Sequence, residues 1–96
     1  MFLRWVRAKD LDCIVYELEK RDIEASRHAY SYRLLYKGMI VAGVHVYPGF
    51  NEASVRLYKI VHDLAEEASS KITESIKKCF PDYKIIIKWY PPRSSF

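Results

Sequence analysis

The spacing of the apolar residues changes along the chain, and this change limits the folds that are open to it. Between positions 10 and 21 the apolar side chains recur at the period of a helix. They are Leu11, Ile14, Val15 and Leu18. Residues 26–37 instead alternate between apolar and polar, and residues 39–47 run apolar, which is typical of strands. Both periods within one short chain predict an α+β fold.

The length of 96 residues is enough for one hydrophobic core. Half of the residues are hydrophobic and 29% are charged, which is the composition of a folded protein. We therefore expect a single domain at residues 1–90 and a flexible C-terminal tail at residues 91–96. Charges within the first ten positions interrupt any apolar run before it reaches the length of a signal peptide or membrane span, so we expect a cytoplasmic protein. The absence of glutamine is typical of a thermophilic source.

Four strands are expected from the alternating segments. Residues 26–37 and 39–47 predict a hairpin that turns at Lys37-Gly38. Residues 2–7 predict a strand before the first helix, and residues 83–90 predict a last one.

A long second helix is expected after the hairpin. Asn51 is a favourable N-cap, and apolar residues then recur at the helical period as far as Phe80. At ~1.5 Å per residue this helix would be about 40 Å long, more than a hairpin of this size can cover. Either the helix breaks near Ser69-Ser70 or it packs against a second chain, and we expect a dimer.

The expected order is thus β-α-β-β-α-β, with an antiparallel sheet covered on one face by two helices. This order is compatible with a ferredoxin-like split βαβ fold, or with a three-stranded sheet to which a fourth strand is added.

The net charge of +4 is divided unevenly between the expected elements. The first helical segment, residues 10–24, is acidic, with six carboxylates against Lys20 and Arg21. Residues 1–9, 25–50 and 83–96 are basic, at +3 each. The strands are therefore expected to carry the positive charge and the helices the negative charge.

Position parity suggests that the basic residues of each strand share one face, because side chains in a strand alternate between its two faces. Placed opposite the helices, these cations would lie beside Tyr90 and either His45 or Tyr47, an arrangement suited to phosphate contact and base stacking. The candidate nucleic-acid-binding residues are Arg27, Arg33, Lys37, Lys84 and Lys88. A solvated outer face kept soluble by Lys and Arg is an equally good explanation of the pattern.

No catalytic or metal-binding motif accompanies this charge pattern. His28, His45 and His62 are isolated in sequence, and the Glu66-Glu67 carboxylates diverge on a helix. We therefore expect no enzyme activity, no metal site and no cofactor. Cys13 and Cys79 stand 66 positions apart without a CxxC pair, and we interpret both as small buried apolar residues.

Several short motifs resemble the small dimerising subunits of the KEOPS complex, the Pcc/CTAG-like family. They are Ile14-Val15-Tyr16-Glu17 in the first helix, Arg27 entering the hairpin, Gly38 at its turn, and Val55-Arg56, within Asn51–Leu57, opening the second helix. The resemblance covers roughly residues 2–79. Two features depart from the family pattern: Tyr58-Lys59-Ile60-Val61 stand where the family has small residues and an asparagine, and residues 83–96 add a strand.

The resemblance implies a non-catalytic subunit of the complex that makes threonylcarbamoyladenosine in tRNA. Such a subunit pairs with another copy or with a related subunit, and docks its helices on the catalytic subunit. A divergent paralogue that pairs with a standard subunit would fit both departures. The partner-binding residues implied are Leu11, Ile14, Val15, Tyr16, Leu18, Arg56, Leu57, Ile60 and Leu64.

Two other classes of function stay open. One is a free-standing nucleic-acid-binding protein that uses the basic face of the sheet. The other is an enzyme whose site is assembled at a dimer interface.

Overall fold

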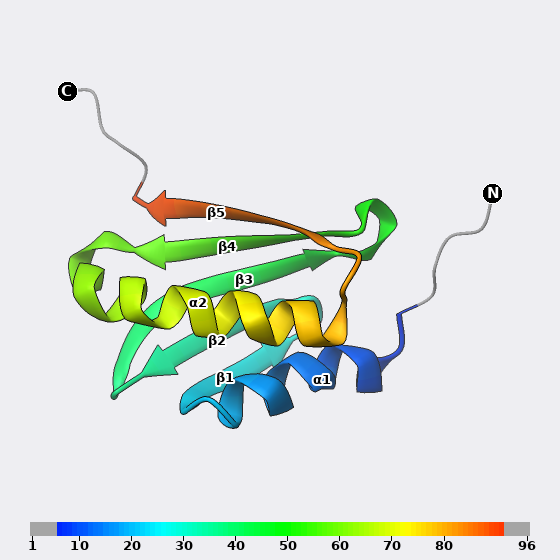
Figure 1. The fold of residues 1–96 in the computed structure, drawn as a ribbon, viewed down its shortest axis with the longest axis horizontal. Helices are drawn as coiled ribbons and strands as arrows, with labels where there is room; N and C mark the ends of the chain where they lie inside the picture. Colours follow the sequence, from blue (N-terminus) through cyan, green and yellow to red (C-terminus); the bar gives the residue numbers. More distant parts are fainter. Residues whose placement is uncertain (1–5, 92–96) are drawn as a thin grey trace.

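The computed structural model describes residues 6–91, which form a five-stranded sheet and two α-helices (Figure 1). The elements are, in chain order, α1 (Ala8–Glu19), β1 (Ile23–His28), β2 (Ser31–Tyr36), β3 (Met39–Tyr47), the 3-10 turn η1 (Pro48–Phe50), β4 (Glu52–Tyr58), the 3-10 turn η2 (Lys59–Val61), α2 (His62–Cys79) and β5 (Lys84–Tyr90). The expected α+β class is confirmed.

The five strands lie side by side in chain order, β1-β2-β3-β4-β5. The first four are antiparallel neighbours, whereas β5 pairs in parallel with β4. A parallel pair requires a crossover connection, and α2 provides it. Both helices lie on the same side of the sheet (Figure 1). The sheet is therefore mixed, and the expectation of a purely antiparallel sheet is wrong.

The helix α1 forms where the apolar period predicts it. Its buried side chains include Leu11, Ile14 and Leu18, which lie on the stripe that packs against the sheet. At its start, the Arg7 backbone N–H donates a hydrogen bond to Asp10 Oδ2 at 3.1 Å. This bond gives a partner to one donor near the helix N-terminus, where intrahelical acceptors are lacking.

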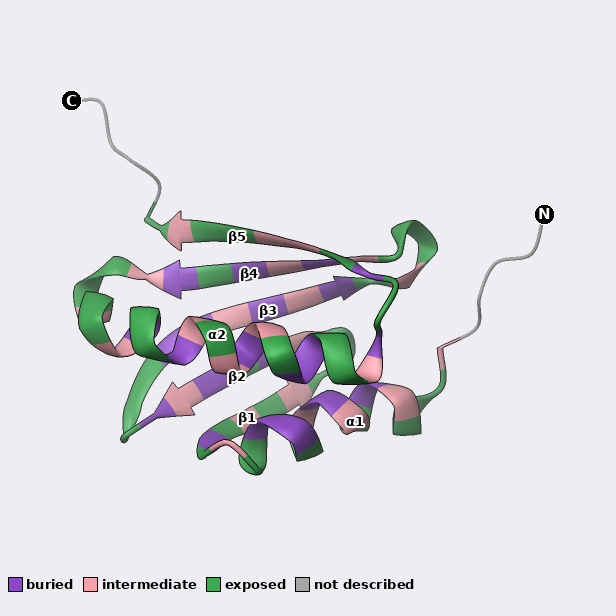
Figure 2. Ribbon diagram, in the orientation of Figure 1, coloured by how far each residue is buried: buried purple, intermediate pink, exposed green. Residues whose placement is uncertain are grey.

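The core fills the space between the helices and one face of the sheet. Buried and more exposed residues therefore alternate along the strands (Figure 2). On β2 the inward residues are Tyr32, Leu34 and Tyr36. The inward residues of the next two strands include Ala42, Val44, Val46, Ala53, Val55 and Leu57, and α2 contributes Ala65, Ala68, Ile72 and Ile76. The buried Tyr32 hydroxyl donates to the Leu11 carbonyl at 2.7 Å, so this polar group keeps a partner inside the core.

The expected second helix is wrong over its first turns. Residues 52–58 form β4, and α2 begins only at His62. Asn51 is in the left-handed region at φ 50°, where it ends the turn that follows Pro48 and starts a strand instead of a helix. With 18 residues, α2 is about 27 Å long, so its length gives no reason for a second chain.

The segment 26–37 is not one strand. The chain reverses at Ala29-Tyr30, with Ala29 at φ 54°, and this tight turn joins β1 to β2. No glycine or proline marks the reversal, so the sequence pattern missed it. The turn at Lys37-Gly38 is confirmed, with φ of 52° and 81° at the two residues, as a two-residue hairpin loop requires.

The two ends of the chain bear on two other expectations. Most of the strand expected at residues 2–7 lies outside the described residues, and Val6 and Arg7 precede α1 without strand structure. The described order is α-β-β-β-β-α-β, in place of β-α-β-β-α-β. Nearly all of the expected tail, residues 92–96, also lies outside the described part. Within residues 6–91 no helix is long and apolar enough to cross a membrane.

Cys13 and Cys79 form a disulfide between α1 and the last residue of α2, with their Cα atoms 5.9 Å apart. The interpretation of both as separate apolar residues is therefore wrong. Sequence spacing did not reveal the pair, because the two helices become neighbours only when both pack on the same face of the sheet.

The buried stripe of α1 gives a direct test of the core. Ile14→Ala should lower the free energy of unfolding by about 2–5 kcal/mol, because Ile14 is fully buried and the change leaves a cavity. Ile60→Ala is the matched control, since Ile60 is 91% exposed and its loss should change stability by no more than about 0.5 kcal/mol. Urea denaturation measures both, and equal effects of the two substitutions would contradict the described core.

The disulfide gives a second test of how the helices lie. Closing a loop between positions 66 residues apart restricts the unfolded chain, so Cys13→Ala/Cys79→Ala should lower the free energy of unfolding by about 2–4 kcal/mol. Intact mass measured before and after reduction reports whether the bond is present. Two free thiols in the native, non-reduced protein would contradict this packing of α1 beside the end of α2.

Candidate functional site

The face of the sheet turned away from the helices, here called the open face, is not covered by any described element. Strand alternation and register place the following side chains on it: Glu24, Ser26 and His28 on β1; Ser31, Arg33 and Leu35 on β2; Ile40, Gly43, His45 and Tyr47 on β3; Glu52, Ser54, Arg56 and Tyr58 on β4; and Lys84, Ile86, Lys88 and Tyr90 on β5. Chemically, this surface differs from the apolar inward face.

Three cations lie in one line across the strands of the open face. Arg33 is paired in register with Gly43, Gly43 with Arg56, and Arg56 with Lys88. Neighbouring strands are ~4.8 Å apart, so this cationic row (Arg33, Arg56 and Lys88) spans about 15 Å. No carboxylate among residues 6–91 forms an ion pair with a member of the row. The three charges are therefore available to an anionic ligand.

A hollow interrupts the row at Gly43. Because Gly43 has no side chain, the surface sinks between Arg33 and Arg56. One part of the hollow, about 420 Å³, is lined by residues that include Ser26, Arg33, Gly43 and Tyr58. An adjoining part of about 130 Å³ is lined by residues that include His45 and Arg56. A Cβ atom at Gly43 would lie 3.4 Å from the Tyr58 hydroxyl oxygen, so even a small side chain would take up part of this space.

Aromatic and polar groups border the row on its two sides. On one side, the rings of Tyr58 and Tyr90 meet edge to face with centroids 6.1 Å apart, and the Arg56 guanidinium carbon lies 6.0 Å from the Tyr90 centroid. On the other side, Ser31 Oγ and His45 Nδ1 are hydrogen-bonded at 2.7 Å. The open face thus combines cations, ring faces and hydrogen-bonding groups.

Three of the five basic residues predicted to bind nucleic acid lie on the open face: Arg33, Lys84 and Lys88. The other two do not. Arg27 points to the helix side, where its Nε donates to Asp12 Oδ1 at 2.8 Å, and Lys37 lies in the hairpin turn with its Nζ 3.2 Å from Glu67. The parity argument failed for Arg27 because the turn at Ala29-Tyr30 reverses which positions face the helices.

Most of the residues predicted to bind a protein partner form the core instead. Leu11, Ile14, Leu18 and Leu57 are buried, and Val15 and Leu64 pack partly buried against them. Tyr16 and Ile60 are exposed, at 63% and 91%, but lie on α1 and η2. Arg56 lies on the open face. Gly43 and Tyr58 also lie there, and the sequence pattern predicted neither of them as a site residue. The alternation of Ala53, Val55 and Leu57 was the signal that could have placed Arg56 in a strand.

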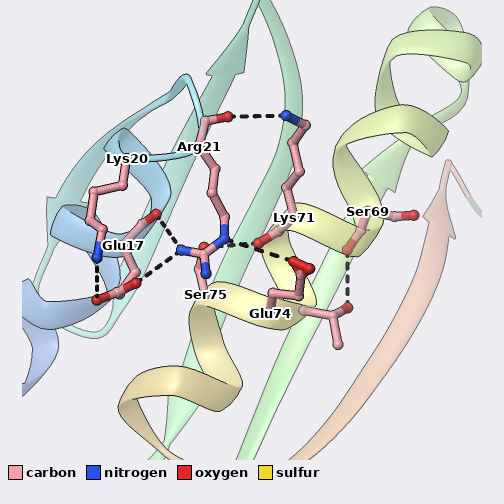
Figure 3. A network of polar contacts seen from close by, with 8 residues as sticks. Glu17, Lys20, Arg21, Ser69, Lys71, Glu74 and Ser75 are labelled. Atoms are coloured by element: carbon pink, nitrogen blue, oxygen red, sulfur yellow. Dashed lines mark hydrogen bonds and ion pairs between the residues drawn. The ribbon is translucent and has the colours of Figure 1, made fainter.

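Several charges on the helix side form ion pairs within the protein. Figure 3 shows Arg21 between the two helices: its Nη1 donates to Glu17 Oε1 at 2.9 Å, and its Nε lies 3.9 Å from Glu74 Oε2. The Arg21 guanidinium, with Lys20 also close, holds the pKa of Glu17 below its usual value. This pairing contrasts with the cations of the open face, which have no ion-pair partner among residues 6–91.

A second pair of contacts on the helix side joins the hairpin turn to α2. The Tyr36 hydroxyl donates to Glu67 Oε2, and the Lys37 ammonium lies beside the same carboxylate. Both contacts lower the pKa of Glu67, and the same carboxylate raises the pKa of Tyr36 and of Lys37.

Comparison of the chain with protein-family models, with curated proteins and with solved structures found no match. Within residues 6–91 no three His, Cys, Asp or Glu side chains gather where they could hold a metal ion.

The Glu17–Arg21 contact predicts a specific dependence of stability on pH. Because the folded state lowers the pKa of Glu17 below 4.5, ionised Glu17 stabilises the fold at neutral pH, and this stabilisation is lost as the pH falls below that value. Glu17→Gln should therefore be less stable than the wild type at pH 7 and should lose less stability between pH 5 and pH 3. Urea midpoints at the three pH values measure the difference. Glu66→Gln, on the exposed side of α2, is the control, and a Glu17→Gln profile parallel to the wild type would contradict the prediction.

Proposed function

We propose that this protein binds nucleic acid through the open face of its sheet. The observation that carries the proposal is the cationic row of Arg33, Arg56 and Lys88, without carboxylate partners in the described chain and centred on the hollow at Gly43. Neutralising backbone phosphates with such cations releases counterions, which supplies much of the affinity in protein–nucleic-acid complexes.

The arrangement of the face favours a ligand over simple solubility. A face that only has to stay soluble needs charges, but it needs neither a line of cations on adjacent strands nor exposed rings beside them. Arg33 and Arg56 carry planar guanidinium groups, which match the geometry of phosphate oxygens better than an ammonium does. Across the open face, four cations stand against two carboxylates, those of Glu24 and Glu52.

Membership of the KEOPS small-subunit family stays a prediction based on the short motifs. Two features expected with it are absent from residues 6–91: residues 52–58 form strand β4 in place of a helix, and α2 has an ordinary length of 18 residues. Co-purification from native extract, with mass spectrometry of the proteins that come along, tests it directly. Recovery of the catalytic subunit of the complex would support membership, and recovery of a lone monomer would contradict it.

Fluorescence anisotropy with labelled oligonucleotides tests the proposed function. Arg33→Gln/Arg56→Gln should bind about tenfold more weakly than the wild type, because each substitution removes one phosphate contact. The slope of log K against log salt should become shallower by about 1.4 for a single strand and by about 1.8 for a duplex.

A matched control separates the position of the charge from its amount. Lys9→Gln/Lys78→Gln removes the same charge from exposed positions on α1 and α2, away from the open face, and should retain most of the affinity. Equal losses in the two double variants would contradict a specific role for the open face. A wild type that binds no oligonucleotide at low salt would contradict nucleic-acid binding altogether.

A further inference from the structure

The cationic row has different neighbours on its two sides, and this asymmetry bears on the kind of nucleic acid that fits. Along β4 the outward residues are Ser54, Arg56 and Tyr58, separated by two residues each, or about 6.7 Å. In the β4–β5 pair, Tyr58 lies opposite Tyr90 and Arg56 lies opposite Lys88. The Tyr58–Tyr90 pair therefore lies beside Arg56 and Lys88, two residues further along β4 and β5.

The Tyr58–Tyr90 pair offers ring surface to a ligand. Tyr90 is 46% exposed, and its ring meets that of Tyr58 edge to face at an interplanar angle of 73°. Aromatic side chains on an open sheet bind bases by stacking, which needs a base whose face is free. In a duplex the neighbouring base pairs cover those faces, so the tyrosines would have nothing to stack on.

The cations also suit one backbone better than two. Arg33, Arg56 and Lys88 lie in a single line across four strands, and Lys84 is the remaining cation of the face. The adjacent line consists of His28, Ser31, His45, Ser54 and Ile86, which carry no fixed positive charge. A single line of cations can follow one phosphate backbone, whereas a duplex presents two.

The hollow at Gly43 lies between the two arginines of this line. Arg33 and Arg56 are both register partners of Gly43, about 10 Å apart across β3. Part of a sugar-phosphate backbone can therefore sink toward β3 while its phosphates contact the guanidinium groups on either side. A side chain at position 43 would oppose this approach because it would occupy part of the hollow, with its Cβ atom in van der Waals contact with the Tyr58 hydroxyl.

We infer that the ligand is a single-stranded nucleic acid which crosses the strands of the sheet, with its backbone along the cationic row and its bases against Tyr58 and Tyr90. This inference rests on the proposed function and specifies its substrate class. The backbone would run from Arg33 on β2, over Gly43, to Arg56 and Lys88.

Fluorescence anisotropy with labelled oligonucleotides of about 12 nucleotides tests the inference. The affinity is measured for single strands and for duplexes, of RNA and of DNA. Single strands should bind at least about tenfold more tightly than the matching duplexes. Tyr58→Leu/Tyr90→Leu should lose about tenfold or more in single-strand affinity, because stacking is lost, while Tyr58→Phe/Tyr90→Phe should stay within about threefold of the wild type. Preference for RNA or for DNA supports the inference equally.

Gly43→Val provides an independent arm, because valine is well suited to a strand but occupies the part of the hollow above β3. It should weaken single-strand binding about tenfold, with circular dichroism and the urea midpoint reporting that each variant is folded. Equal affinity for duplex and single strand, or unchanged binding by a folded Tyr58→Leu/Tyr90→Leu variant, would overturn the inference. In that case the proposed function would still stand if Arg33→Gln/Arg56→Gln weakens binding, whereas no binding to any oligonucleotide would overturn both.

Discussion

Burial of one face of a five-stranded sheet under two helices is the constraint on which the other features of this structure depend. The helices cover only one face, so each strand must alternate between core residues and outward residues. On β4 this places Val55 and Leu57 inside and Arg56 and Tyr58 outside. The same alternation on neighbouring strands, in a fixed register, is what brings cations from three strands into one line. The cationic row is thus a consequence of how the core is built.

The helix layer is tied together by contacts that leave the open face free. The disulfide between Cys13 and Cys79 joins α1 to the end of α2, and Arg21 bridges carboxylates of both helices. Lys37 is used in a similar way, beside Glu67. Arg21, Arg27 and Lys37 on this side of the sheet are therefore paired with carboxylates within the protein. The cations of the open face have no such partners in the described chain, and this difference is the basis for assigning binding to that face.

Local patterns in the sequence predicted the elements whose period is unambiguous. The stripe of α1, the turn at Lys37-Gly38 and the strand β5 follow from spacing and from glycine alone. The misplaced parts depend on information that is not local. Ala29 adopts the left-handed region without a glycine, and residues 52–58 satisfy a strand period while Leu57 also fits the helical period that continues at Ile60 and Leu64. Tertiary pairing with β3 and β5 decides in favour of the strand.

Those two local errors changed which cations were assigned to the open face of the sheet. The unrecognised turn at Ala29-Tyr30 placed Arg27 on the wrong face, and the helix expected from Asn51 kept Arg56 out of the cations assigned to the sheet.

Titration of ¹⁵N-labelled protein with a short single-stranded oligonucleotide, followed by ¹H–¹⁵N correlation spectra, tests the central claim most directly. The account predicts that shift changes concentrate on β2–β5 around Gly43 and Arg56, with α1 and α2 largely unchanged. Changes confined to the two helices, or no changes at a saturating concentration, would contradict it.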